Sequence, residues 1–162
     1  MNIRAIVYLL LVASVFSSCG KKTVSKVPIV GLIYFGPQTP LPQAPNSVRA
    51  NHDTCTLEFS LSDGDADLGV IQPGQRDIYI KDFRYDTGFV GYLFPSDLDF
   101  SIEDPKKGLT GTCIFYFPPF LLTPRIDSLH PTSDTTHMAF YIVDRAGNHS
   151  DTVNTGNIIM LR

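Results

Sequence analysis

Apolar and polar residues alternate along residues 54–61, and this alternation constrains the fold more than any other feature of the chain. Four apolar residues would share one side of an extended segment, namely Cys55, Leu57, Phe59 and Leu61. The residues between them are polar, and a strand with one apolar and one polar face is typical of an antiparallel sheet. Beyond residue 18 the periodicity of a helix is nearly absent, so we expect an all-β domain.

Other short runs rich in β-branched and aromatic residues are bounded by Gly, Pro, Asn and Asp, as strands are. The expected strands are residues 27–35, 54–61, 76–82, 89–94, 99–103, 111–117, 137–143 and 152–161. Four prolines make residues 36–53 an extended loop or edge segment, because proline has no amide hydrogen for a ladder. About seven such strands predict an immunoglobulin-like antiparallel β-sandwich over residues 27–162.

The N-terminus has the layout of an export signal. Arg4 supplies a positive charge, residues 5–16 are almost entirely apolar, and Ser17 and Ser18 precede Cys19. The apolar run is shorter than the roughly 20 residues of a transmembrane helix. We therefore expect residues 1–18 to be a signal peptide and residues 19–26 to be a polar tether.

Residues 16–19, Phe-Ser-Ser-Cys, resemble the lipobox of bacterial lipoproteins, in which small residues precede the cysteine that receives the lipid. The resemblance implies that Cys19 carries diacylglycerol through a thioether and a further acyl chain on its amino group. Several acyl chains on one residue give stable membrane anchoring. The alternative is an ordinary secretory signal with a cysteine nearby by chance.

Cys55 and Cys113 remain once Cys19 is assigned to the lipid. Each lies in an expected strand without another cysteine nearby in the sequence, which gives a zinc site little support. Exported proteins can form disulfides, so we predict a Cys55–Cys113 bond between two strands. The alternative is a pair of buried free thiols, because unpaired cysteine is often a small core residue.

Two loops contain the acidic residues that are candidates for binding a cation. Asp63, Asp65 and Asp67 alternate in a glycine-containing loop, and this spacing suits calcium, which takes about 6–8 oxygen ligands. The loop is not an EF-hand, because its twelfth position is Gly74 and no helices flank it. The second loop follows residues 137–143 and contains Asp144 and Asn148.

The expected topology would bring these two loops together. In an immunoglobulin-type sandwich, the loop after the second strand and the loop before the last strand lie at the same end. We therefore predict a shared calcium site formed by Asp63, Asp65, Asp67, Asp144 and Asn148, in which the cation offsets the repulsion between carboxylates. The alternative is two ordinary turns, because Asp, Gly and Asn favour turns for backbone reasons alone.

Residues 57–69, LEFSLSDGDADLG, together with residues 141–148, YIVDRAGN, resemble small uncharacterised lipoproteins of the Bacteroidota type. These proteins carry a strand–DGDGDLG element and a later DRAGNxS element on an immunoglobulin-like domain, and Ala66 replaces a glycine of that pattern. The resemblance implies lipid anchoring at the bacterial outer membrane. Lys21 and Lys22 stand where surface-exported members carry acidic residues, which favours a periplasm-facing anchor over the cell surface.

The sequence contains none of the usual catalytic signatures. It has no Gly-x-Ser-x-Gly elbow, no His-Glu-x-x-His pair and no phosphate-binding loop. The histidines show no ligand spacing; they are His52, His130, His137 and His149. A formal net charge of −3 without a basic run gives no reason to expect nucleic acid binding.

We therefore expect a non-enzymatic binding or structural module that meets the membrane through its lipid and has a protein partner in the cell envelope. Alternatives are an accessory subunit of a larger envelope complex and a carbohydrate-binding or hydrolytic protein. Five aromatic residues either form a sugar- or peptide-contacting surface or belong to the core: Phe83, Tyr85, Phe89, Tyr92 and Phe94.

Overall fold

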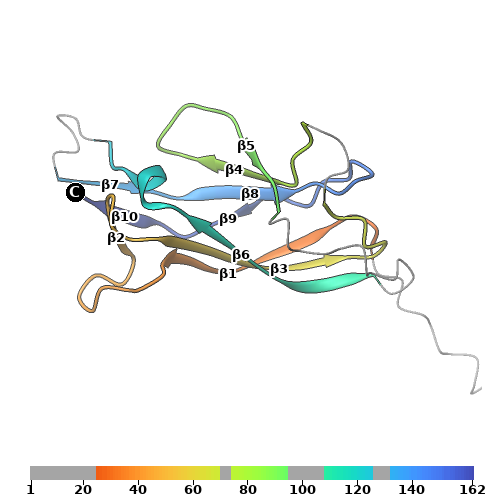
Figure 1. Ribbon diagram of the computed structural model, residues 1–162, viewed down its shortest axis with the longest axis horizontal. Helices are drawn as coiled ribbons and strands as arrows, with labels where there is room; N and C mark the ends of the chain where they lie inside the picture. The colour runs from red at the N-terminus through yellow and green to blue at the C-terminus, as the bar shows by residue number, and fades with distance from the viewer. Residues whose placement is uncertain (1–24, 70–73, 95–107, 126–131) are drawn as a thin grey trace, which may run out of the picture.

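The computed structural model describes residues 25–69, 74–94, 108–125 and 132–162 (Figure 1). The strands are β1 (Ile29–Pro37), β2 (Ser47–Arg49), β3 (Cys55–Asp63), β4 (Ile78–Asp82), β5 (Val90–Tyr92), β6 (Leu109–Phe117), β7 (Ser133–Thr136), β8 (Met138–Ile142), β9 (Val153–Asn154) and β10 (Ile158–Leu161). A short 3-10 helix, η2, spans Pro119–Leu122. The expected all-β architecture is confirmed. No helix in the described ranges is long and apolar enough to cross a membrane.

Some predictions fall on residues outside the described ranges. They are the signal peptide, Cys19, the tether up to residue 24, the strand at residues 99–103 and His130. The lipid anchor therefore stays a prediction from the sequence.

β3 is the centre of a three-stranded antiparallel sheet in the order β1–β3–β6. Its alternation holds at most positions: Leu57 and Phe59 are fully buried, Glu58 is half-buried and Ser60 is exposed. Thr56, expected on the polar face, is buried. Leu57 lies opposite Phe35 of β1 and Phe115 of β6, so apolar residues of three strands meet on the inner face.

The second layer consists of β5–β4–β8–β9 and β2–β10–β7. In Figure 1, β7 and β8 follow one another along the chain on one side of the molecule, and β1, β3 and β6 lie in the facing layer. Phe59 of β3 and Phe140 of β8 join the layers, with ring centroids 5.1 Å apart and both side chains fully buried. The antiparallel all-β architecture is thus established, and the narrower immunoglobulin-like assignment stays a prediction.

The bounds of the other strands shift by a few residues, and the structure departs from the expected strands at three further places. The last expected strand is divided into β9 and β10 at residues 155–157, where Thr155 pairs with Met138 through both its backbone and its hydroxyl. The short strand β7 precedes β8 and was not expected. β2 lies in the proline-rich segment expected to be a loop or an edge, and it pairs in parallel with β10.

The predicted Cys55–Cys113 disulfide is wrong. Cys55 lies opposite Phe117 and Cys113 opposite Phe59, so the two cysteines are four positions apart on neighbouring strands. Four positions correspond to about 13 Å along a strand, whereas a disulfide needs Cα atoms about 4.4–6.8 Å apart. Both are buried free thiols, and burial raises the pKa of Cys55 to about 12 and that of Cys113 to about 11.

Candidate metal centre

The first acidic loop begins at the last residue of β3. Asp63 is fully buried, and its Oδ2 accepts a hydrogen bond of 3.0 Å from the backbone amide of Asp67. Ala66 adopts a left-handed conformation with φ of 54°, the conformation for which glycine is favoured. Leu68 is fully buried in the core and fixes the end of the loop.

The second acidic loop is a tight turn after β8. The backbone amide of Asp144 donates to the carbonyl of Asn148, and that of Gly147 donates to the carbonyl of Asp144. The backbone amide and side-chain Nδ2 of Asn148 donate to Oδ1 and Oδ2 of Asp144, each at 2.7 Å. These bonds fix the carboxylate of Asp144, which is 6% exposed, in one orientation.

The two loops lie side by side, as the sequence predicted. The backbone amides of Arg145 and Ala146 donate to the carbonyl and the Oδ2 of Asp67, at 2.9 and 3.1 Å. The Nε of Arg145 donates to the carbonyl of Gly69 at 2.9 Å. The guanidinium of Arg145 therefore binds the first loop at the carbonyl of Gly69.

Four carboxylates converge where the loops meet. One oxygen from each of Asp63, Asp65, Asp67 and Asp144 lies within 4.8 Å of the others. Asn148, the fifth predicted ligand, does not direct its side-chain oxygen at Asp144. A carboxylate only accepts hydrogen bonds, so the group of Asn148 that faces Asp144 is its amide NH2. Asn148 thus orients a ligand through its amide nitrogen.

Three oxygens of this cluster are buried without a hydrogen-bond donor among the described residues: Oδ1 of Asp63, Oδ1 of Asp65 and Oδ1 of Asp67. A buried acceptor that lacks a donor is costly, and more so when it is charged. The nearby cation is Lys26, whose Nζ lies 3.9 Å from Oδ2 of Asp65 and whose side chain is 80% exposed. Because the Lys26–Asp65 ion pair is so exposed, it offsets little of the negative charge of the cluster.

The electrostatics of the cluster favour a proton or a metal ion. Burial raises the pKa of Asp63 to about 6, with additional contributions from Asp65 and Asp67. Burial also raises the pKa of Asp67, followed in size by the effect of Asp144. Ionising all four carboxylates at neutral pH therefore costs free energy that a bound cation would return.

The donor set points to the class of cation. All four ligands are carboxylate oxygens, which suit calcium and other hard cations, whereas zinc prefers nitrogen and sulfur. Calcium binds oxygens at about 2.3–2.6 Å, so two ligands on opposite sides of the ion are about 5 Å apart. The observed spread of 4.8 Å fits a single ion.

The five aromatic residues considered for a binding surface do not form one group. Phe83, Tyr85 and Phe89 are exposed, Tyr92 is half-buried and packs against the core, and Phe94 is buried. A pair of aromatic residues does stack between β4 and β8. The sequence did not predict this pair, because the stacking depends on the register of the two strands.

Tyr79 and Tyr141 lie directly opposite each other in that register and stack with ring centroids 5.0 Å apart. His149 stacks on Tyr141 at 5.4 Å, and Phe89 meets Tyr141 edge-on. The stacked rings thus cover much of one another's faces, which reduces the area that a sugar ring could contact.

No protein-family model, curated protein or solved structure matches this chain.

Proposed function

We propose that this protein is a lipid-anchored extracytoplasmic module that binds calcium between two loops and has no enzymatic activity. The observation that carries the proposal is the convergence of four carboxylates, three of which have a buried oxygen without a donor among the described residues. A bound divalent cation would satisfy these oxygens and neutralise part of their charge.

The position of the cluster indicates what the cation would do. Asp63 ends β3 in one layer, and Asp144 follows β8 in the facing layer. An ion held by both would join the ends of two sheets at one pole of the domain. Because only the folded chain brings these residues together, the ion would stabilise the folded state.

The anchor part of the proposal depends on residues 1–22. Cys19 would hold the domain at the outer membrane, and Lys21 and Lys22 favour the periplasmic side. A rigid β domain on a short tether suits contact with a protein partner in the cell envelope.

Thermal unfolding of the mature protein in detergent tests calcium binding. The protein is stripped of metal and melted with and without calcium, with magnesium as a comparison. Ligand at a hundredfold excess over its dissociation constant adds about 2.7 kcal/mol to the free energy of unfolding, which would raise the melting temperature by several degrees. Asp65→Asn and Asp144→Asn should each abolish the rise.

Asp151→Asn is the matched control, because Asp151 is an exposed aspartate outside the cluster. It should leave the calcium effect intact. An unchanged melting temperature of the unmodified protein at millimolar calcium would reject the metal site.

Detergent-phase partitioning tests the anchor separately. The Cys19→Ala variant should be unlipidated and leave the detergent phase, whereas the Cys113→Ala variant should remain in it. If Cys19→Ala still partitions into detergent, the anchor assignment is wrong.

A further inference from the structure

The first residues of the described chain are attached to the acidic loop. The backbone amide of Gly64 donates a 2.7 Å hydrogen bond to the carbonyl of Ser25. The Nζ of Lys26 lies 3.9 Å from Oδ2 of Asp65. The segment that leads from Cys19 into β1 therefore meets the domain at the same loop that supplies three of the four carboxylates.

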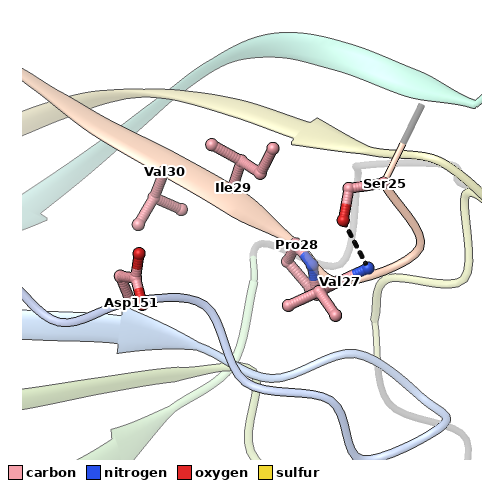
Figure 2. A pocket seen from close by; sticks show the side chains of 6 residues that line it. All are labelled: Ser25, Val27, Pro28, Ile29, Val30 and Asp151. Atoms are coloured by element: carbon pink, nitrogen blue, oxygen red, sulfur yellow. Dashed lines mark hydrogen bonds between the residues drawn. The ribbon is translucent and has the colours of Figure 1, made fainter. Parts of the chain in front are cut away.

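Other contacts of this segment are limited. The backbone amide of Val27 turns back to Oγ of Ser25 at 3.1 Å, as Figure 2 shows, and Val27 is 44% exposed. Pro28 is the first of the described residues whose side chain is fully buried. On its other side the segment borders a cavity of about 230 Å³ lined by Ser25, Val27, Pro28, Ile29, Val30 and Asp151 (Figure 2).

The hydrogen bond from Gly64 depends on the shape of the acidic loop. Gly64 stands between Asp63 and Asp65, and both neighbours contribute an oxygen to the cluster. The direction of its N–H follows from the backbone of the same loop that holds these two carboxylates. A cation that draws the carboxylates together would keep the N–H aimed at Ser25, whereas mutual repulsion in its absence would loosen the loop.

We propose that calcium in this site clamps the segment that connects the lipid anchor to the domain. The inference rests on the proposed function and adds a regulation to it. With calcium bound, residues 25–28 lie on the domain and only residues 19–24 act as a tether. Without calcium, residues 25–28 join the tether and lengthen it by roughly 13 Å, since an extended chain spans about 3.3–3.6 Å per residue. Calcium would thereby set how far the domain stands from the membrane.

Limited digestion with a lysine-specific endoproteinase tests the clamp on the mature lipoprotein in detergent. Cleavage after Lys26 requires residues 25–28 to leave the domain, whereas Lys22 precedes the contact residues and is an internal reference. Calcium should slow cleavage after Lys26 by at least about tenfold relative to cleavage after Lys22, because a clamped segment is cut only after it opens locally.

Two substitutions at one position test the hydrogen bond. Gly64→Pro removes the N–H that Ser25 accepts, and Gly64→Ala, the matched control, keeps it. Gly64→Ala should behave like the unmodified protein, and Gly64→Pro should be cut rapidly after Lys26 with or without calcium.

Isothermal titration with calcium on the same samples separates the two proposals. If the unmodified protein binds calcium and its cleavage after Lys26 is unchanged, the clamp is wrong and the metal site stands. If titration detects no calcium binding, both are wrong.

Discussion

Asn148 holds both carboxylate oxygens of Asp144, with its backbone amide 2.7 Å from Oδ1 and its side-chain Nδ2 2.7 Å from Oδ2. Among the described residues, Asp144 is the single member of the carboxylate cluster that comes from the second loop. Asn148 therefore orients the one carboxylate that the second loop contributes to the cluster.

Replacing Asn148 with Ala should weaken calcium binding without removing a ligand. The variant keeps the backbone bond to Oδ1 and loses the one to Oδ2, so Asp144 can turn away. Loss of an outer partner of a metal ligand typically lowers affinity by about 10–100-fold. Calorimetric titration of the metal-stripped variant would measure the change. His149→Ala, which removes a neighbouring side chain stacked on Tyr141, should leave the affinity unchanged. Equal affinities of the two variants would mean that the side chain of Asn148 does not orient Asp144 for calcium.

Gly108, the residue before β6, lies against the acidic loop. Its φ of 67° is left-handed, and an added Cβ would lie 2.8 Å from the carbonyl oxygen of Asp63 and 3.2 Å from Cα of Gly64. Gly108→Ala should therefore lower the free energy of unfolding by about 1–2 kcal/mol or more and also weaken calcium binding.

Gly111, which lies within β6, offers the matched control for that substitution. An added Cβ there meets nothing within 4 Å, and its φ is not left-handed. Gly111→Ala should therefore leave the free energy of unfolding unchanged or slightly higher. Urea unfolding of both metal-free variants checks the prediction, which is wrong if Gly108→Ala costs no more than Gly111→Ala.

The parts of the structure that were predictable depend on local signals. The alternation in residues 54–61 predicts which side chains of β3 are buried, because the period of a strand is two. The spacing of Asp63, Asp65 and Asp67 predicts that their oxygens converge. Ala66 adopts the left-handed backbone for which glycine is favoured.

The parts that were missed depend on pairing between distant strands. The sequence places Cys55 and Cys113 in strands, but register alone decides that Cys113 faces Phe59. In another sheet, the register of β4 against β8 creates the Tyr79–Tyr141 stack. β2 forms from Ser47–Arg49 because β10 offers it hydrogen bonds, and a three-residue strand beside several prolines has no local signal of its own.

The thiols of Cys55 and Cys113 should be unreactive in the native protein. Burial raises both pKa values, to about 12 and about 11, and the thiolate is the reactive form. At pH 8 an aromatic disulfide reagent should find neither thiol in the folded protein and both after unfolding without a reductant. If the reagent does not find two thiols in the unfolded chain without a reductant, Cys55 and Cys113 are joined by a disulfide after all.

The same raised pKa values predict how stability changes at high pH. An unfolded thiol ionises near its ordinary pKa of about 8.5, whereas both thiols stay protonated in the folded chain. The free energy of unfolding should therefore fall as the pH rises above about 9, until the folded thiols ionise as well. Cys113→Ala should make this fall shallower in urea titrations between pH 8 and pH 10.

Arg84 links three segments from a buried position. It is 5% exposed, and its guanidinium donates to the carboxylate of Asp82 and to the carbonyls of Leu121 and Thr123. Asp82 also accepts a 2.8 Å hydrogen bond from the hydroxyl of Thr136. Burial by itself would raise the pKa of Asp82, but hydrogen bonds from Arg84 and Thr136 hold it below its ordinary value. The pair therefore connects the end of β4 to β7 and to the segment around η2.

Replacing Arg84 with Met should destabilise the protein strongly. The variant leaves the charge of Asp82 without its partner and two carbonyls without their donor, and breaking a buried pair in this way costs about 3–5 kcal/mol. The free energy of unfolding of Arg84→Lys should lie between those of the unmodified protein and Arg84→Met. An ammonium keeps the charge, but it lacks the planar fork with which Arg84 reaches a carboxylate and two carbonyls at once. Urea unfolding at pH 7 measures all three proteins. A loss below about 1 kcal/mol for Arg84→Met would be that of a surface ion pair, and it would mean that Arg84 does not organise this junction.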